Sequence, residues 1–288
     1  MSAHAPRDAI DGLIQGCIGP AVGIRQVTAL RIRAEREHWV VTLADGREAV
    51  LSRFKDGDRS TVNTSLPPCA TARKCAWASE LTAHGIPVPQ TLGWCCQDQE
   101  AALLTTRIVT LPGRDDARVL AAQRLARLHR LTPAQLSPEL RELVLASDPR
   151  MQRSTGTLMP PGAREDTAWC DRHAPLLREL QDLEESAPRL ASAVLVHGDL
   201  VASNLLASEQ GVVIIDWETL ALGDPMWDLA ILVASSQTWD AQRCDQEVAA
   251  YARDAPLEPV ALDWHIRRWR CFWALRSLTR EDPPAAMR

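Results

Sequence analysis

The order of predicted elements changes near residue 110, and this change constrains the fold more than any other feature of the sequence. In the first part of the chain, apolar residues recur with helical spacing at Ile10–Ile18 and again at residues 70–85, where Gly85 ends the pattern. Three short apolar runs within residues 25–55 alternate as strands do, and residues 85–109 continue as extended chain. The first part is therefore predicted to contain a helix, three strands, a second helix and one or two further strands.

Beyond residue 113, helical spacing dominates to the end of the sequence. This asymmetry predicts an α+β chain of two lobes. We expect residues 1–109 to form a small β-rich N-terminal lobe, residues 110–288 to form a larger helical lobe, and residues 107–113 to act as the hinge between them. Within the first lobe, Ala44-Asp45-Gly46 is a strong signal for a hairpin between two strands.

The composition excludes several classes of protein. The 288 residues carry a formal net charge of −5, which argues against nucleic-acid binding because that function needs a basic face. Apolar runs such as Leu229–Ala234 are too short to span a membrane, and the N-terminus lacks the pattern of a secretory signal. The eight cysteines include no Cys-x-x-Cys pair, so we expect free thiols in a reducing cytoplasm, with neither disulfides nor a zinc site.

One stretch of the helical half departs from the helical pattern. Residues 196–206 (VHGDLVASNLL) place polar side chains between two short apolar β runs, and a turn at residues 208–211 follows. Asn204 comes five residues after Asp199, and Asp216 comes twelve residues after Asn204. A loop of that length can bring Asn204 back beside Asp199, and the hairpin then returns Asp216 to the same point.

Two carboxylates and an amide in this arrangement suit phosphoryl transfer. The transferred group needs Mg²⁺ to neutralise its charge, and Mg²⁺ prefers hard oxygen ligands. Asn204 and Asp216 are the candidate metal ligands. Asp199 is the candidate catalytic base, which would orient an acceptor hydroxyl and take its proton.

These motifs resemble those of a known family. His-Gly-Asp-Leu-x-x-x-Asn followed by Ile-Ile-Asp-Trp-Glu is similar to the signature of the aminoglycoside phosphotransferase and choline kinase family, and Gly223–Ala230 (GDPMWDLA) resembles another block of it. Gly-Ile-Pro-Val-Pro at residues 85–89 and Arg-Leu-His at 127–129 are further landmarks. The resemblance implies a two-lobed, protein-kinase-like fold, with ATP or GTP as the phosphoryl donor. It also implies that Asp228 braces the catalytic loop, with His197 and Glu218 as structural supports.

The resemblance fails at the expected phosphate-binding pair. The family places a basic residue on the third strand, where this chain offers Ser52, Arg53 or Lys55, and we favour Arg53 because its planar guanidinium can bind phosphate. The partner acid of the following helix is missing, since the sequence there is Arg73-Lys74-Cys75-Ala76 and Glu80 lies too far along.

The nucleotide base is expected at the hinge. No glycine-rich loop is present, and Arg-Ala-Glu-Arg-Glu-His takes its place at residues 33–38. The fold therefore implies that the segment from Thr106 to Val109, including Ile108, contacts the base. The sequence does not distinguish ATP from GTP.

The leading hypothesis is a small-molecule kinase that transfers the γ-phosphoryl group of ATP or GTP to a substrate hydroxyl. Antibiotics of the aminoglycoside or macrolide type are favoured as acceptors, because acids in the C-terminal region would suit a cationic substrate; these are Asp240, Asp245, Glu247, Asp263, Glu281 and Asp282. Choline, thiamine or a sugar is the alternative acceptor.

Four further alternatives are weighed on sequence alone. The missing helix acid motivates a non-catalytic nucleotide-binding protein, whereas a protein kinase is disfavoured because no activation segment separates Asp216 from Gly223. Trp264, Trp269 and Trp273 have near-helical spacing that predicts core packing, with substrate stacking as the alternative. Both a monomer and a homodimer are compatible with the sequence.

Overall fold

Alternating apolar side chains build an antiparallel sheet in the first part of the chain. The computed structural model describes residues 7–20, 22–32, 36–55, 66–97, 100–111, 116–147, 165–189, 192–209, 211–235 and 240–281. The five strands of the sheet are β1 (Ile24–Ile32), β2 (Arg36–Leu43), β3 (Glu48–Lys55), β4 (Thr91–Gln97) and β5 (Glu100–Thr106). They are ordered β1-β2-β3-β5-β4, and each neighbouring pair is antiparallel.

The predicted hairpin at Ala44-Asp45-Gly46 is confirmed. β2 and β3 pair directly across it, from Thr42 with Glu48 to Arg36 with Phe54. Gly46 has φ of 87°, a value that costs glycine little and other residues considerably more. The register of β3 matters for the site because it decides which side chains point to which face of the sheet.

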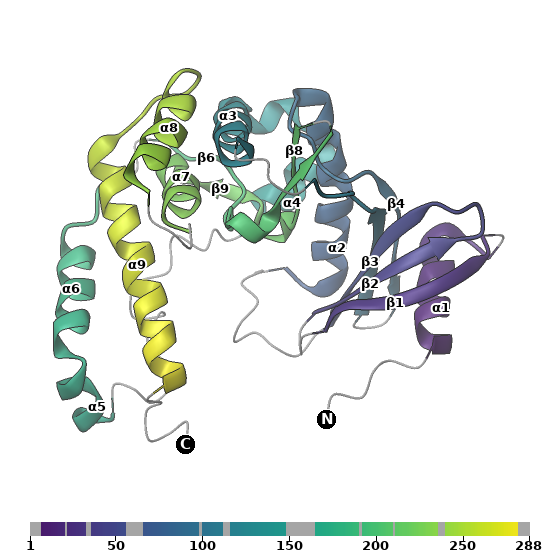
Figure 1. Cartoon of the computed structure of the whole chain (residues 1–288), viewed down its shortest axis with the longest axis horizontal. Helices are drawn as coiled ribbons and strands as arrows, with labels where there is room; N and C mark the ends of the chain where they lie inside the picture. The colour runs from purple at the N-terminus through teal and green to yellow at the C-terminus, as the bar shows by residue number, and fades with distance from the viewer. Residues whose placement is uncertain are drawn as a thin grey trace.

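A helix covers each face of this sheet (Figure 1). On one face, α1 (Arg7–Ile18) buries Ile10 and Ile14 against Ala49 and Leu51 of β3. On the other face, α2 (Pro68–Trp77) buries Ala72 and Ala76 against Phe54. Because successive residues of a strand point to opposite faces, Arg53 shares the α1 face with Leu51 and Ser52 shares the α2 face with Phe54.

The helix predicted at residues 70–85 is present but changes type along its length. After α2 the chain tightens into the 3₁₀ helix η1 (Ala78–His84), which Gly85 ends with a left-handed φ of 75°. Leu81 and Ile86 pack in the main core of the helical lobe. In space, therefore, this segment belongs with the second lobe although it precedes residue 109.

The second lobe is mainly helical. Its helices are α3 (Ala117–Arg130), η2 (Pro133–Gln135), α4 (Pro138–Leu145), α5 (Thr167–Arg172), α6 (Ala174–Glu185), η5 (Ala202–Asn204), η6 (Trp217–Thr219), α7 (Pro225–Ala234), α8 (Ala241–Ala252) and α9 (Pro259–Glu281). Its short strands are β6 (Val194–Val196), β7 (Leu205–Ser208), β8 (Gly211–Ile214) and β9 (Ala221–Gly223). The long α9 lies between α6 and α7 and contacts both (Figure 1). The expected α+β, two-lobed architecture is confirmed.

The predicted hinge makes one backbone hydrogen bond to each lobe. Arg107 N donates to Glu48 O of β3 at 3.1 Å, and Leu111 N donates to Ala207 O of β7 at 2.9 Å. The segment thus connects the sheet of one lobe to the hairpin that carries the polar residues of the other. Residues 112 and 113 of the predicted hinge lie outside the described residues.

The expectation of free thiols throughout is wrong for two cysteines. Cys69 of α2 and Cys96 of β4 form a disulfide, with a Cα–Cα distance of 5.4 Å. That separation is typical of disulfides. The two residues are 27 positions apart in the sequence, and only the packing of α2 on the sheet brings them together.

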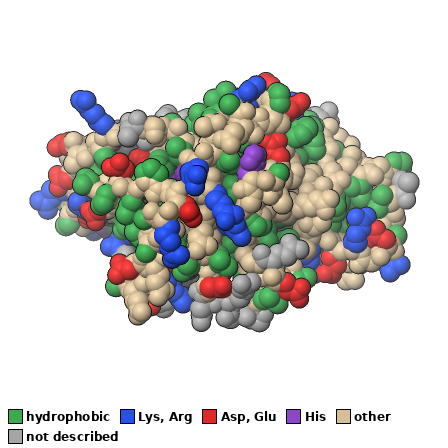
Figure 2. Space-filling model, turned by 90° about the horizontal axis from the view of Figure 1, so that it is seen from above, with side chains coloured by type: hydrophobic (Ala, Val, Ile, Leu, Met, Phe, Trp, Pro, Cys, Tyr) green, Lys and Arg blue, Asp and Glu red, His purple; other side chains and the backbone are tan. Residues whose placement is uncertain are grey.

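Charge is mixed over the visible surface. On the face shown in Figure 2, acidic and basic side chains are interspersed among apolar and neutral ones. In the part of the chain that the structure describes, none of the helices combines the length and apolar character needed to cross a membrane.

Candidate active site

The polar motif lies on two short strand pairs of the helical lobe. β6 pairs with β9, and β7 pairs with β8. The turn His197–Asp199 follows β6 directly, η5 carries Asn204 into β7, and Asp216 follows β8 after one intervening residue. The two strand pairs therefore hold the predicted residues at their ends.

Hydrogen bonds bring Asp199, Asn204 and Asp216 together. Asn204 Nδ2 donates to the Asp199 carbonyl at 2.8 Å, which returns the amide to the start of the loop. Ile215 N donates to Asn204 O at 3.0 Å, so the residue before Asp216 is bonded directly to Asn204. The convergence expected from the five- and twelve-residue spacings is thus present.

Asp216 has an unusual backbone. Its φ and ψ are 71° and 51°, and it is the one non-glycine residue with positive φ in the described ranges. A left-handed conformation costs an ordinary residue about 1–2 kcal/mol, and such strain concentrates at functional positions. The contacts of the residues before and after Asp216 must therefore hold this conformation in place.

The His197 ring links the two halves of the site. Its Nδ1 accepts from Asp199 N at 3.2 Å, so Nε2 carries the proton and donates to Ile215 O at 2.9 Å. The ring is fully buried and makes an edge contact with Trp217. His197 was predicted as a structural support, and that role stays a prediction.

Asp228 binds the backbone of the catalytic turn. Its two carboxylate oxygens accept from His197 N at 2.6 Å and from Gly198 N at 2.8 Å. Asp228 lies on α7 and is fully buried, so the turn is bonded to the interior of the lobe. This is the arrangement expected of a residue that braces the loop.

Two other side chains complete the turn, and the sequence analysis did not identify them. Thr219 Oγ1 donates to His197 O at 2.6 Å, and Trp227 Nε1 donates to Gly198 O at 3.1 Å. Gly198 itself has φ of 85°, and a Cβ atom there would lie 2.9 Å from Thr219 O. Trp227 stands inside the GDPMWDLA block, so its place in the motif was visible, whereas its bond was not.

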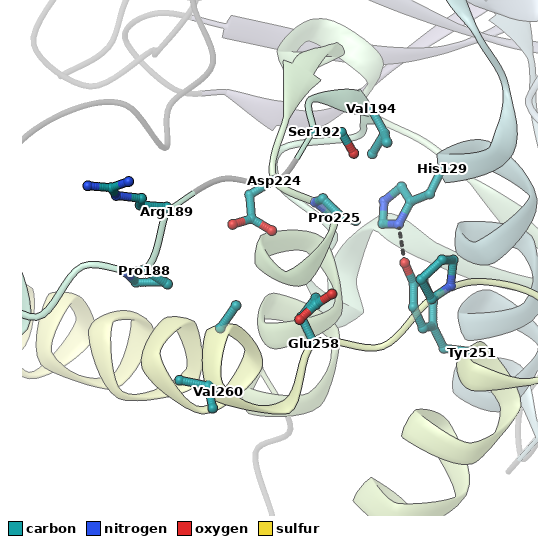
Figure 3. Close-up of a pocket in the computed structure, with 12 residues that line it drawn as sticks. His129, Pro188, Arg189, Ser192, Val194, Asp224, Pro225, Tyr251, Glu258 and Val260 are labelled. Atoms are coloured by element: carbon teal, nitrogen blue, oxygen red, sulfur yellow. Dashed lines mark hydrogen bonds between the residues drawn. The ribbon is translucent and has the colours of Figure 1, made fainter.

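The helical lobe also contains a cavity of about 280 Å³, whose lining includes Val194 and Pro225 (Figure 3). His129 lines it, with Nδ1 2.8 Å from Tyr251 Oη and Nε2 3.4 Å from Asp228 Oδ2. Asp224 lines the cavity as well. Burial acts to raise the pKa of the Asp224 carboxyl, but the hydrogen bond from His265 and the other favourable contacts outweigh burial, so the pKa is lowered. Asp199, Asn204 and Asp216 are not among the lining residues drawn in Figure 3, so this cavity is separate from the polar cluster.

The residue favoured for phosphate binding has other partners. Arg53 Nε donates to Glu100 Oε2 at 2.9 Å, and Arg53 Nη1 donates to Glu37 Oε2 at 3.1 Å. Lys55 also binds Glu37, at 2.7 Å. Ser52 lies on the opposite face, with its Oγ 2.9 Å from His38 Nδ1. The structure therefore does not bring Arg53 to the cluster around Asp199, and its phosphate-binding role stays a prediction.

The predicted base-binding residues lie at the lobe junction. Thr106 ends β5, and its Oγ1 accepts from Gln90 N at 3.0 Å. Ile108 is half-buried in the connecting segment between Arg107 and Leu111. Glu218, predicted as a support, is buried on η6 two residues after Asp216.

The donor set fits a divalent cation of the Mg²⁺ class. The bond from Asn204 Nδ2 to the Asp199 carbonyl orients the amide, so its carbonyl oxygen lies on the other side. The backbone bond from Ile215 N to Asn204 O places the residue before Asp216 beside Asn204. Carboxylate and amide oxygens are the hard ligands that Mg²⁺ takes.

Comparison with known proteins identifies relatives of this arrangement. Residues 26–269 match the sequence model of the group described as "Phosphotransferase enzyme family". Thiamine kinase of Escherichia coli O6:K15:H31 (strain 536 / UPEC) is 32% identical over 107 residues, which are 37% of this chain and 35% of that protein. The alignment thus spans about a third of the length of that curated relative.

Solved structures share the fold at low identity. Amicoumacin kinase hAmiN superimposes with a TM-score of 0.67 and 14% identity, covering 94% of this chain and 86% of that one. Macrolide 2'-phosphotransferase type I gives a TM-score of 0.61 and 18% identity, covering 97% and 93%. At these identities the likeness shows the two-lobed, kinase-like fold.

Proposed function

This chain belongs to the phosphotransferase enzyme family, and on that premise we propose that it is a small-molecule kinase. It would transfer the γ-phosphoryl group of ATP or GTP to a substrate hydroxyl. Asp199 would be the catalytic residue, and Asn204 and Asp216 would hold Mg²⁺. The reaction would take place in the cytoplasm, where both nucleotides are abundant.

One observation carries the proposal. Asp199, Asn204 and Asp216 come from three separate segments, and the bonds from Asn204 Nδ2 to Asp199 O and from Ile215 N to Asn204 O join those segments. Two acids and an amide held together on strand ends rarely serve packing alone. The strained backbone of Asp216 supports a functional role as well.

The chain's own residues would act on the acceptor. The Asp199 carboxylate would accept a hydrogen bond from the acceptor hydroxyl and take its proton as the oxygen attacks the γ-phosphorus. The bond from that phosphorus to the β,γ-bridging oxygen would break, and ADP or GDP would leave. His197 keeps the backbone of Asp199 in place through its Nδ1. Mg²⁺, when bound by Asn204 and Asp216, would neutralise charge on the phosphates.

For the acceptor we propose an antibiotic of the aminoglycoside or macrolide type first. Some of the acids that suggest a cationic substrate have other partners in the structure. Glu247 Oε1 binds Arg118 Nε at 2.6 Å, and Asp240 caps α8. Asp282 lies outside the described residues. The remaining acids, Asp245, Asp263 and Glu281, are the ones left to support this choice.

A metabolite kinase is the second candidate. The thiamine kinase match favours it, because that relative shares 32% identity over its aligned 107 residues. Choline and sugars are further acceptors of this class. A non-catalytic nucleotide-binding protein is the third candidate, and Arg53 supports it because two carboxylates already bind its guanidinium.

A turnover panel distinguishes these candidates. Purified protein is mixed with Mg²⁺, with ATP or GTP, and with single aminoglycosides, macrolides, thiamine, choline or sugars, and release of ADP or GDP is measured. Release stimulated by one class of compound assigns the acceptor. Nucleotide binding without release on the full panel would support the non-catalytic candidate and overturn the kinase proposal.

A further inference from the structure

Lys74 is a buried cation that the proposed chemistry does not use. It is one of two lysines in the sequence, lies in the middle of α2, and is 1% exposed. Lysine is almost never fully buried, because an ammonium group loses strong hydration when it leaves water. A lysine in such a place needs specific hydrogen-bond partners, and it restrains the segments that carry those partners.

Its two partners lie in the helical lobe. Lys74 Nζ donates to Leu220 O at 2.9 Å and to Ser147 Oγ at 2.7 Å. Ser147 Oγ in turn donates to Leu143 O at 2.7 Å, so its lone pairs face the ammonium group. The contacts join α2 to the end of α4 and to the segment that follows η6.

Leu220 connects this contact to Asp216. η6 begins immediately after Asp216, and Leu220 closes it by donating its N–H to Trp217 O at 3.1 Å. On the other side of Asp216, the His197 ring binds Ile215 O at 2.9 Å. The strained Asp216 is therefore held between two bonded carbonyls, one before it and one after it.

The side of α2 that faces β3 includes an apolar cluster. Ala72 and Ala76 of α2 pack on Phe54 of β3, and the sequence of α2 contains no acid. The bond from Lys74 of α2 to Leu220 O instead reaches the segment that follows Asp216. The buried charge on α2 is positive, whereas the family resemblance implies an acid on this helix.

We propose that Lys74 is a positioning residue, whose bond to the Leu220 carbonyl ties α2 to η6 and keeps the Asp216 carboxylate beside Asn204. The inference rests on the proposed function, because it concerns the metal ligand of that site. The position of α2 would then affect Mg²⁺ binding and turnover through the bond from Lys74 to Leu220 O.

The test replaces Lys74 with methionine, which has a similar length and no hydrogen-bond donor. We expect kcat to fall by about 10-fold and the Mg²⁺ concentration for half-maximal rate to rise by about 10-fold, as when an outer partner of a metal ligand is lost. The KM for the acceptor is expected to stay within about 2-fold, since Lys74 lies away from it in this account.

Two controls separate positioning from loss of stability. Ser147→Ala removes the second partner and keeps the Leu220 bond, so its Mg²⁺ dependence should match that of the wild type. Leu140→Ala opens the buried core of α4 and lowers the melting temperature without touching η6. If Leu140→Ala shifts the Mg²⁺ dependence as much as Lys74→Met does, positioning by Lys74 is wrong.

A readout without turnover keeps the inference distinct from the proposed function. Mn²⁺ binding in the presence of a non-hydrolysable nucleotide, followed by electron paramagnetic resonance, should weaken about 10-fold in Lys74→Met and stay unchanged in Ser147→Ala. Equal Mn²⁺ affinity in wild type and Lys74→Met overturns the inference, whatever the panel gives. If Lys74→Met does not fold, Lys74→Leu, which also lacks a hydrogen-bond donor, is measured by the same criteria.

Discussion

The turn from His197 to Asp199 is held chiefly through its backbone. The N–H groups of His197 and Gly198 bond to Asp228, and their carbonyls bond to Thr219 and Trp227. Four backbone groups of two consecutive residues are thus satisfied by three side chains from other segments. The turn that carries Asp199 is therefore fixed from the interior of the lobe through its backbone.

Replacing Asp228 with asparagine tests this account at the level of one residue. The amide offers one acceptor oxygen where the carboxylate offers two, so one buried N–H loses its partner. We expect the free energy of unfolding to fall by about 2–3 kcal/mol, measured by urea denaturation. Turnover is expected to fall by more than about 10-fold, because the turn loses its orientation.

Asp240→Asn is the matched control for this change. Asp240 also accepts two backbone N–H bonds, from Gln242 and Arg243, but at the exposed start of α8. Its replacement should affect stability only slightly, because asparagine is as good an N-cap as aspartate. An Asp228→Asn protein that is as stable and as active as Asp240→Asn would contradict the bracing role.

Local chemistry made the main site residues predictable, and distance in the sequence hid their partners. Asp199, Asn204 and Asp216 fall within one strand–loop–hairpin unit, so their spacing was enough to bring them together. Thr219 binds a residue 22 positions away, and Lys74 binds one 146 positions away. Such contacts depend on how separate segments of the chain pack in three dimensions, which no local pattern records.

At the scale of elements, α2 is attached to the sheet by a covalent bond as well as by packing. The Cys69–Cys96 disulfide joins α2 to the edge strand β4. On the opposite face of β4, Cys95 Sγ lies 3.6 Å from Cys17 Sγ of α1, and both are thiols. Adjacent residues of one strand thus contact both helices that cover the sheet.

Removing the α2 disulfide should lower stability measurably. Cross-linking residues 27 positions apart restricts the unfolded chain, by about 3 kcal/mol in the chain-entropy description. We expect the double replacement Cys69→Ala and Cys96→Ala to lower the free energy of unfolding by about this amount under non-reducing conditions. Reductant should lower the wild-type value similarly and leave the double variant unchanged. Equal stability of the two proteins without reductant would show that the bond does not form.

The elements themselves were partly visible in the sequence. Turn chemistry located the β2–β3 hairpin through Asp45-Gly46, and Gly85 marked the end of the second helix. The change of that helix from α to 3₁₀ at Ala78 was not visible, nor was the packing of Leu81 and Ile86 in the core of the helical lobe. This packing places both residues, which precede residue 109, in the main core of the helical lobe, and the boundary at residue 109 stays a prediction.

At the scale of the whole molecule, the buried Lys74 links global stability to pH. Burial lowers the pKa of Lys74 from its ordinary value of 10.5 to about 8. Between these values the unfolded chain binds a proton that the folded chain does not, so folding becomes more favourable as pH rises. The size of this contribution is about 3 kcal/mol over the full window.

Comparison of wild type with Lys74→Met isolates that contribution. The difference in unfolding free energy, wild type minus variant, should rise by about 3 kcal/mol from pH 7.5 to 10.5. Other groups titrate in both proteins and cancel. Urea denaturation at a series of pH values measures the difference, and a flat or falling curve would contradict a buried ammonium at Lys74.

The central claim is that Asp199 performs the chemistry on a site assembled from three segments. The measurement that tests it most directly is single-turnover phosphoryl transfer by Asp199→Asn, with nucleotide affinity measured on the same sample and Asp240→Asn as the control. The account predicts transfer slower by at least about 10²-fold at unchanged nucleotide affinity, since asparagine can hold a hydroxyl but cannot take its proton. Transfer by Asp199→Asn at the rate of Asp240→Asn would contradict it.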